Sequence, residues 1–545
     1  MRRAFEAVKE RALAHPLVTV CLIALPSAFL SALDIWTRRI VGTYDPDEAG
    51  YLAASMRMQR SVDFRHPMAL VHEFFFSRTG PLVPLGSVAT LIAGPRDPRS
   101  AMMIQPILLI LLGVATAGIV RHVATPAWAI VSGAFIVSLP NVVWSAESYW
   151  FGLGAATAMA VALWSLVASD GLIDRRRWVF GAAVAAMVLA RTMAIAFLPA
   201  LGLAVLIVAW GDRRRLRGAV EAAAVALLVA GPWFVVRRQD VFGYLFNYGY
   251  TERAARFGHD NALERVRGRL WMVNDDTFHI LVIITVPAIV IQLLRARWGP
   301  ISTWSSRRKE VTSLAVVVVG GALALATSSN NGVWFDLPLY APMIAIGVVA
   351  AARTSPLTAR PLAAGMLIAA ILAPVGVRYG YVDRVEFGAF HYDARFTGPP
   401  DDQSRQAAGE WAAFDRRLAS RLAQLTGRGR TGEVILTGNT FLANTNTVGL
   451  AAELDGWTLV PLVPDTTKDP SSWRGQLRPT SLVWRDGKPL DRFIVVLDHD
   501  HLPFPPDGRW RAFRRAAIKA GWTEVERVAF PLNSGDAVIY RAPPR

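Results

Sequence analysis

The stretch LVTVCLIALPSAFLSALDIWTRRIVGTYDPDEAGYLAAS (Leu17–Ser55) begins as an apolar run and ends beyond a group of acids. The apolar part, Leu17–Trp36, follows a basic head and is long enough to cross a bilayer. It is too long for a signal-peptide core and has no convincing cleavage site. We therefore expect an uncleaved membrane anchor with an acidic segment just beyond it.

Three acids in this segment, Asp45, Asp47 and Glu48, surround Pro46 at the predicted start of a helix. An N-cap Asp45, a proline at the first helical position and Glu48 two residues later form a capping box. Asp45 and Glu48 also suit the positive end of the helix dipole. Asp47 is not required by this cap, so it is the candidate for chemistry.

The helix that follows is expected from Glu48 to about Arg60. Tyr51, Ala54 and Met58 fall on one of its sides, which is typical of a helix lying in the membrane interface.

The composition indicates that much of the chain lies in lipid. Of its 545 residues, 53% are hydrophobic and only 18% are charged, whereas soluble domains average about 25% charged. The lone Cys21 excludes a disulfide framework or a cysteine-based metal site within one chain. The net charge of +16 does not indicate nucleic-acid binding, because the arginines cluster in short connectors between apolar segments.

About eleven spans are expected, which makes the chain a multi-pass α-helical membrane protein. After Leu17–Trp36 they fall near Ala101–Val120, Ala127–Val143, Tyr149–Ala168, Trp178–Ala190, Met193–Trp210, Gly218–Val236, Thr277–Leu294, Val311–Ser328, Trp334–Ala352 and Pro361–Arg378. The segment Gly80–Gly94 is short and contains two prolines and three glycines, so we expect it to be re-entrant or surface-lying.

The positive-inside rule supports this interpretation of Gly80–Gly94. If it does not cross, the basic connectors all share the side of the basic N-terminus; they are Asp174–Trp178, Gly211–Gly218, Arg295–Glu310 and the pair Arg353 and Arg360. The outer face then receives the first loop (37–100), Asn141–Ser148, Arg237–Asp276 and the region after about Tyr379. The active region is thus expected on the extracytoplasmic side of a bacterial inner membrane.

The tail is more polar and predicts a small extracytoplasmic α/β domain. Its expected helices are Arg405–Leu425 and a second one near residues 508–522, and its expected strands are Glu433–Gly438, Arg492–Asp498 and a closing hairpin. The predicted division is a membrane domain (1–380) and an outer domain (381–545).

Ionisable residues at the outer mouths of spans are candidate ligands for a substrate, because burying them without compensation is costly. Each has a structural alternative: Glu147 as the cap of the next span, Asp336 as half of an ion pair, and Arg78 as a snorkelling side chain. The full set of candidates for substrate binding is Tyr51, Arg78, Glu147, Arg191, Glu252, Arg256, Asp336 and Tyr340.

Other catalytic motifs are missing from the sequence. There is no His-Glu-x-x-His, no phosphate-binding loop and no nucleophile elbow. DHDH (Asp498–His501) ends a strand, and its residues alternate faces, so a loop is the better interpretation than a metal site. We expect no metal and no cofactor.

YDPDEAGYLAAS (Tyr44–Ser55) resembles the Asp-Glu motif in the first outer loop of the GT-C glycosyltransferases, in particular the protein O-mannosyltransferases and the lipid A aminoarabinose transferase. FNYGYTERAARF (Phe246–Phe257) and WFDLPLYAPMIAIG (Trp334–Gly347) are similar to later outer segments of that group. RTGPLVPL (Arg78–Leu85) is similar to its Lys-Pro-Pro region but has Gly80 in place of the lysine.

The resemblance implies an inverting transfer of a sugar from a polyprenyl-phosphate donor to an acceptor hydroxyl of an envelope glycan, lipid or protein. It implies Asp47 as general base, Glu48 as its positioning residue and Arg256 as the first choice for the donor phosphate.

Two other classes stay open at this stage: a lipid or sugar transporter or flippase, and a relative without catalytic activity. The sugar, the acceptor and the chain length of the carrier cannot be read from the sequence.

Overall fold

A computed structural model describes residues 2–38, 46–63, 65–77, 79–250, 263–268, 301–328, 335–354, 356–376, 384–387, 390–393, 402–427, 431–437, 445–457, 459–462, 490–497, 509–531 and 536–543, with positions 261, 290 and 294. The chain divides into two compact units. The helical unit contains Met1–Ile35, Met68–Gly86 and Met102–Pro399, and the mixed unit contains Trp36–Pro67, Ser87–Ala101 and Pro400–Arg545. The mixed unit thus combines parts of the predicted first outer loop with the C-terminal region.

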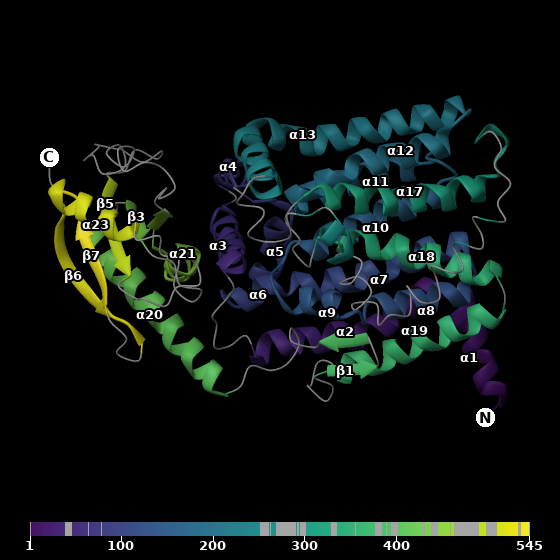
Figure 1. The fold of residues 1–545 in the computed structure, drawn as a ribbon, viewed down its shortest axis with the longest axis horizontal. Coiled ribbons are helices and arrows are strands. Elements are labelled where there is room, and N and C mark those ends of the chain that lie inside the picture. The colour runs from purple at the N-terminus through teal and green to yellow at the C-terminus, as the bar shows by residue number, and fades with distance from the viewer. Residues whose placement is uncertain are drawn as a thin grey trace. The chain divides into compact units, whose positions relative to one another are not determined.

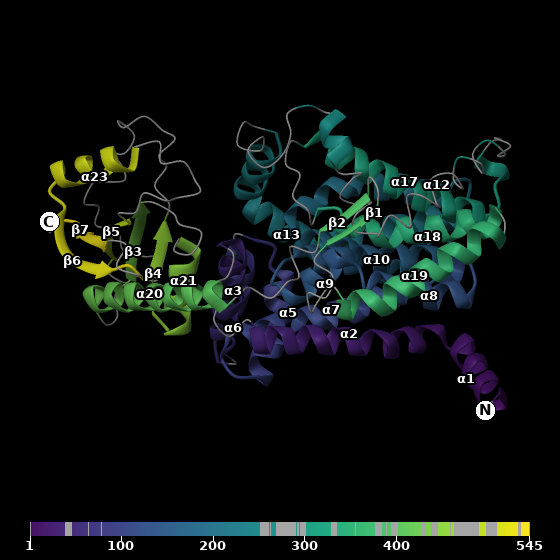
Figure 2. The same cartoon turned by 60° about the horizontal axis from the view of Figure 1, so that its bottom comes forward.

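The helical unit is a bundle whose long helices lie side by side (Figures 1 and 2). In chain order its elements are α1 (Arg2–Ala14), α2 (Pro16–Arg38), α4 (Met68–Phe76), the first residues of α5 (Leu82–Ala93), α7 (Ile104–Val123), α8 (Pro126–Ile136), α9 (Pro140–Glu147), α10 (Gly152–Ala168), α11 (Arg176–Ala190), η2 (Thr192–Phe197), α12 (Leu198–Ala209), α13 (Arg213–Tyr250), η3 (Ile301–Thr303), α17 (Ser306–Thr327), α18 (Leu337–Thr354), α19 (Pro356–Gly376) and the hairpin β1 (Arg384–Phe387) and β2 (Phe390–Asp393). The rest of α5, after Gly86, belongs to the mixed unit.

Small residues allow these helices to approach closely. A Cβ at Gly181 of α11 would overlap the carbonyl oxygen of Ala222 in α13, so the two backbones touch there. This use of glycine is typical of helix packing in membranes, where apolar burial alone gives little drive for association.

The chain is a multi-pass membrane protein by the length and composition of its helices. Six described helices are long and apolar enough to cross a bilayer, or seven if the bent pair α8 and α9 is counted as one span. Every expected span coincides with a helix, bent pair or helix group except Thr277–Leu294, which lies outside the described residues. The expected number of eleven is therefore not reached among the described helices on these criteria.

The expected span Ala127–Val143 coincides with a bent pair of helices. The structure has two helices, α8 and α9, that meet at an angle of 56°. Pro140 is the first residue of α9, and Leu139 before it is extended, with ψ of 137°. A residue before proline is kept out of the helical conformation by the pyrrolidine ring, and this breaks the helix.

The segment Gly80–Gly94 forms the 12-residue helix α5. A helix of that length spans about 18 Å, which is well short of the ~30 Å hydrocarbon core. Its length agrees with the expectation that it does not cross.

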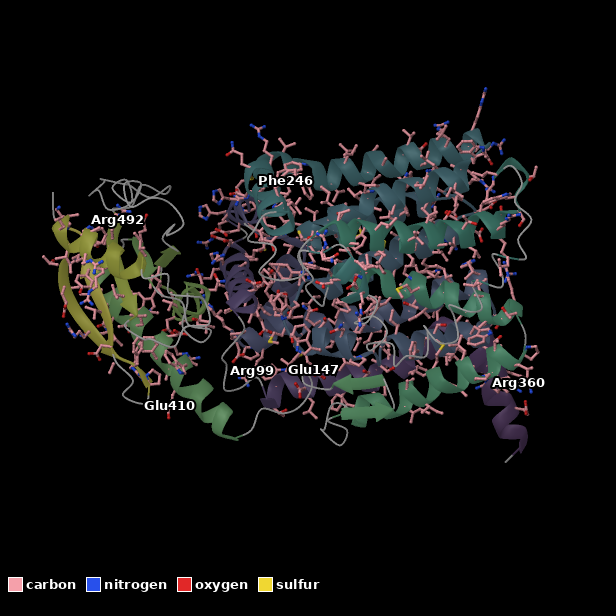
Figure 3. The ribbon with its side chains drawn as sticks, in the orientation of Figure 1. Arg99, Glu147, Phe246, Arg360, Glu410 and Arg492 are labelled. Atoms are coloured by element: carbon pink, nitrogen blue, oxygen red, sulfur yellow. The ribbon has the colours of Figure 1, made fainter. Side chains whose placement is uncertain are left out.

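The basic connectors predicted to share one side do gather at one end of the helical unit. Arg215 donates to Asp170 (2.8 Å) and to Ser306 (3.1 Å), while Arg307 donates to the carbonyl of Val123 and Lys309 to that of Trp210. Figure 3 shows Arg360 at one end of the bundle and Glu147 and Phe246 toward the other. A gathering of basic side chains at one end is the arrangement that the positive-inside rule favours.

The mixed unit is built on a five-stranded sheet with the order β4-β3-β5-β7-β6. The strands are β3 (Thr431–Thr437), β4 (Leu459–Leu462), β5 (Leu490–Leu497), β6 (Thr523–Ala529) and β7 (Asp536–Arg541), and the helices are α3 (Pro46–Arg60), α6 (Pro98–Met102), α20 (Asp402–Thr426), α21 (Thr445–Leu454) and α23 (Arg509–Lys519). β3 pairs parallel with β4 and β5, whereas β7 is antiparallel to β5 and β6. The predicted strands, helices and closing hairpin of the tail are all present.

An ion pair ties the two central parallel strands together. Glu433 of β3 and Arg492 of β5 are register partners, and the Arg492 Nε donates to the Glu433 Oε1 at 2.6 Å. Both side chains are buried, and Figure 3 labels Arg492 within this sheet. Apolar residues of α20 and of the sheet, including Phe414, Leu418 and Phe493, form the core beside it.

If the basic end of the helical unit faces the cytoplasm, the two ends of α13 meet solvent on opposite sides of the membrane. With Cys21 replaced by serine, Arg217→Cys is expected to resist a membrane-impermeant thiol reagent in intact cells, while Phe246→Cys reacts. Arg217 and Phe246 are both exposed on this helix, so a difference in labelling reports the side of the membrane and not burial. The opposite pattern would invert the topology.

Asp415 of α20 predicts a second measurable property. It is buried against Thr447 of α21, and loss of hydration raises the pKa of its carboxyl well above the usual range, although the hydrogen bond with Thr447 acts in the other direction. The folded state therefore keeps a proton on Asp415 at pH values where the unfolded chain has lost it. By linkage, this makes the free energy of unfolding fall as pH rises above the ordinary Asp pKa of about 3.9.

Asp415→Asn keeps the shape and removes this titration. The variant is expected to unfold at the same temperature as the wild type or higher at pH 7, with a smaller decrease between pH 4 and 7. Thermal unfolding in detergent, with the exposed Asp455→Asn as control, measures both. A variant that is clearly less stable at pH 7 would mean that Asp415 is ionised in the folded protein.

Candidate functional site

The first turn of α3 contains the two acids that the sequence places at its start. Pro46 is the first residue of the helix, so Asp47 and Glu48 follow in the first turn, where the helix dipole favours negative charge. Asp47 is exposed, whereas Glu48 is only 1% exposed. Two adjacent carboxyl groups thus have very different environments. Asp45, the predicted cap, lies outside the described residues.

Burial along α3 is not confined to the side that carries Tyr51, Ala54 and Met58. Ala54 and Met58 are buried and Tyr51 is half-buried, but Ala49, Leu52, Ala53, Ser55 and Met56 are buried as well. Because so many of these residues are small, other backbone can pack closely around α3. The helix belongs to the mixed unit and packs against α21.

A second group of candidates lies in the helical unit around Arg191. Arg191 ends α11 in an extended conformation, immediately before η2. Its guanidinium lies over the ring of Phe335, 4.5 Å from the centroid, which is a cation–π arrangement. Asp336 and Tyr340, at the start of α18, are both buried, with 3% and 1% exposure. The structure thus brings Arg191 to the segment that carries Asp336 and Tyr340.

Glu147 is the last residue of α9 and is buried, toward the end of the bundle that lies away from Arg360 (Figure 3). Aromatic residues follow it: Trp150 stacks on Trp144 with centroids 5.9 Å apart, and Tyr149 meets Phe151 edge to face. The predicted alternative of Glu147 as a helix cap is not supported, because Phe151, not Glu147, holds the N-cap position of α10.

Gln105 was missed by the sequence reasoning. It is fully buried in α7, and its Nε2 donates to the Trp150 carbonyl at 3.0 Å. Its Oε1 has no hydrogen-bond partner among the described residues. A glutamine inside an otherwise apolar span was the available signal.

The remaining candidates cannot be placed. Arg78, Glu252 and Arg256 lie outside the described residues. Gly80 can be placed: a Cβ there would overlap the carbonyl oxygens of Leu189 and Ala190. A lysine at this position would not fit the present backbone, which accounts for the departure from the Lys-Pro-Pro pattern.

The acids at the start of α3 and the residues around Arg191 suit different chemical tasks. An exposed carboxylate at a helix start can accept a proton, and an arginine held by an aromatic ring can bind an anion. Among the described residues, no three of the His, Cys, Asp and Glu side chains gather as a metal site would need. DHDH lies outside the described residues.

Comparisons with known proteins define the fold. No family profile matches the sequence, and no curated protein matches it. Solved structures do match over nearly the whole chain. ArnT from Cupriavidus metallidurans bound to undecaprenyl phosphate is similar, with a TM-score of 0.57, 15% identity and coverage of 97% of this chain and 99% of that one.

The apo state of the same ArnT matches with a TM-score of 0.55 and 14% identity, over 96% of this chain and 98% of that one. An Archaeoglobus fulgidus oligosaccharyltransferase tethered with an acceptor peptide matches with a TM-score of 0.50 and 12% identity, over 98% of this chain and 74% of that one. The chain therefore has the fold of the GT-C glycosyltransferases, as its resemblance predicted.

Proposed function

We propose that the chain is an inverting glycosyltransferase that moves a sugar from a polyprenyl-monophosphate donor to an acceptor hydroxyl. One observation carries this proposal: the first-loop helix α3 presents an exposed Asp47 beside a buried Glu48. The shared fold with an ArnT structure that holds undecaprenyl phosphate supports the class of donor.

In the proposed step, Asp47 takes the proton of the acceptor hydroxyl as its oxygen attacks the anomeric carbon. The bond from that carbon to the phosphate oxygen breaks, and the electron pair leaves with the polyprenyl phosphate. A phosphate leaves without protonation, so the second carboxylic acid of an inverting glycosidase is unnecessary. One general base is sufficient, and Asp47 has the solvent access that this role requires.

Glu48 suits the role of a positioning residue because it is buried next to the base. A buried carboxyl needs fixed partners and does not exchange protons freely with a substrate. Asp45 keeps its predicted role as the helix cap, and Tyr51, one turn after Asp47, lies on the same side of the helix.

A cation is also required, because charge grows on the phosphate as it departs. Arg191 is the described arginine that we assign to this role: its guanidinium lies 4.5 Å from the centroid of the Phe335 ring, and arginine binds phosphate through paired N–H groups. Arg256 stays the first choice from the sequence, with Arg78, Glu252, Glu147, Asp336 and Tyr340 as further proposed contacts with donor or acceptor.

The proposed location is a bacterial inner membrane, with α3 and the sheet domain on the extracytoplasmic side. The arginine-rich end of the helical unit then faces the cytoplasm. The acceptor belongs to the cell envelope and is a glycan, a lipid or a protein.

The function is tested by Asp47→Asn. The full chain in nanodiscs is supplied with undecaprenyl phosphate carrying mannose, glucose, galactose or aminoarabinose, and with envelope extract as acceptor. The release of undecaprenyl phosphate is expected to fall about 10²–10⁴-fold, the usual contribution of a general base. Binding of free undecaprenyl phosphate, measured by native mass spectrometry, is expected to change little.

Asp63→Asn is the matched control, since Asp63 is an exposed acid of the same loop that pairs only locally with His66. Asp63→Asn should retain wild-type release. Turnover of Asp47→Asn within tenfold of wild type would remove Asp47 from the reaction. Passage of an intact lipid across the bilayer without release would indicate a flippase instead.

Arg191 is tested by the binding of undecaprenyl phosphate. Arg191→Ala is expected to weaken this binding about 10–10²-fold, the equivalent of one charge-assisted hydrogen bond. Arg191→Lys should recover only part of the affinity for undecaprenyl phosphate, because an ammonium keeps the charge but lacks the planar arrangement of N–H donors. Arg217→Ala, at the other end of the bundle, serves as control, and equal affinities for all three variants would leave the phosphate to Arg256 or Arg78.

A further inference from the structure

The helix α3 is attached to α21 by an ionic contact. Glu453, near the end of α21, forms ion pairs with Arg57 (3.7 Å) and with Arg60. The Glu453 side chain is 7% exposed, while those of Arg57 and Arg60 are 42% and 29% exposed. One buried carboxylate therefore receives two guanidinium groups from the last turn of α3.

A steric contact lies two turns earlier on the same pair of helices. Gly50 of α3 faces Asn446, and a Cβ at Gly50 would lie 3.1 Å from the Asn446 side chain. A larger residue at position 50 would have to displace the Asn446 side chain by a few tenths of an ångström.

The two contacts are in register. Gly50 and Arg57 are seven residues apart, as are Asn446 and Glu453, which is two helical turns and about 10.5 Å on each helix. The two helices therefore run in the same general direction past each other. Two contacts at this spacing fix both the position of α3 along its axis and its rotation about it.

We propose that Asn446 and Glu453 are positioning residues that hold Asp47 and Glu48 in the geometry required for transfer. The inference rests on the proposed function. Asp47 lies three residues before Gly50, so rotation or sliding of α3 moves it directly. At 15 residues, α3 is at the edge of what a helix sustains alone in water, and Gly50 weakens it further. It therefore depends on α21 for a fixed orientation.

Glu453→Gln tests the ionic contact, because it keeps the shape and removes the charge. Hydrogen exchange with mass spectrometry on the full chain in nanodiscs should show more deuterium uptake in peptides from 46–60, and unchanged uptake in the other peptides of the sheet. The kcat for release of undecaprenyl phosphate should fall by about 10²-fold, as for a misplaced catalytic group. Undecaprenyl phosphate affinity should stay at the wild-type value, and Glu453→Asp should recover part of kcat.

Glu526→Gln is the matched control. Glu526 pairs with Arg421 in the same unit, away from α3, so its loss should change neither exchange in 46–60 nor kcat. A Glu453→Gln protein with wild-type exchange in 46–60 would overturn the contact itself. Faster exchange with wild-type kcat would overturn the positioning role. Full activity of Asp47→Asn would instead overturn the proposed function and leave the exchange result intact.

The steric contact is tested by a double-mutant cycle. Gly50→Ala should lower kcat because the new methyl group pushes Asn446 away, and Asn446→Ala should restore kcat in the double variant. Losses that simply add would show that the closeness of the two side chains does not set the position of α3.

Discussion

The burial of one carboxylate, Glu453, against two arginines of α3 is the interaction on which the proposed site depends. Only Glu453 is buried, while Arg57 and Arg60 are partly exposed; loss of the arginines would leave the buried carboxylate without its charge partners. This is a strong constraint for a helix of 15 residues. It explains how α3 can hold the exposed Asp47 in a defined place.

A second constraint, the bilayer, organises the helical unit. Basic connectors gather at one end, with Arg215 bonded to Asp170 and Ser306. Arg191 and the buried acids Glu147 and Asp336 belong to segments predicted at the other end. In the proposed reaction the base comes from the mixed unit and the phosphate-binding cation from the helical unit, and the substrate of both is a lipid-linked sugar.

The sequence predicted much of this because the signals are local. The length of the apolar runs located the helices, and the acids around Pro46 located the start of α3. Short apolar runs bounded by turn residues located β3 and β5. The bend between α8 and α9 was also local, since Pro140 signals it, yet the apolar run hid it. The fold could be inferred from the motif YDPDEAGYLAAS and the arrangement of spans, although identity to matched structures is only 15% or less.

The contacts that could not be predicted join residues that are far apart in the sequence. Glu453 is almost 400 positions from Arg57 and Arg60, and no spacing rule connects them. The helix α21 was not among the elements predicted from the sequence. Gln105 stands out in the sequence as a polar residue in an apolar span, but its partner, the Trp150 carbonyl, lies 45 residues away. Local patterns thus identified the chemical groups, whereas tertiary contacts decide which of them are held in place.

The central claim is that the chain acts on a sugar carried by a polyprenyl phosphate, with Asp47 as base. Mass spectrometry of the lipid that co-purifies with the Asp47→Asn protein from native membranes tests it most directly. The account predicts an intact glycosylated polyprenyl phosphate, enriched over wild type, and its mass would identify the sugar. Bulk phospholipids alone in both preparations, with no polyprenyl species, would contradict the account.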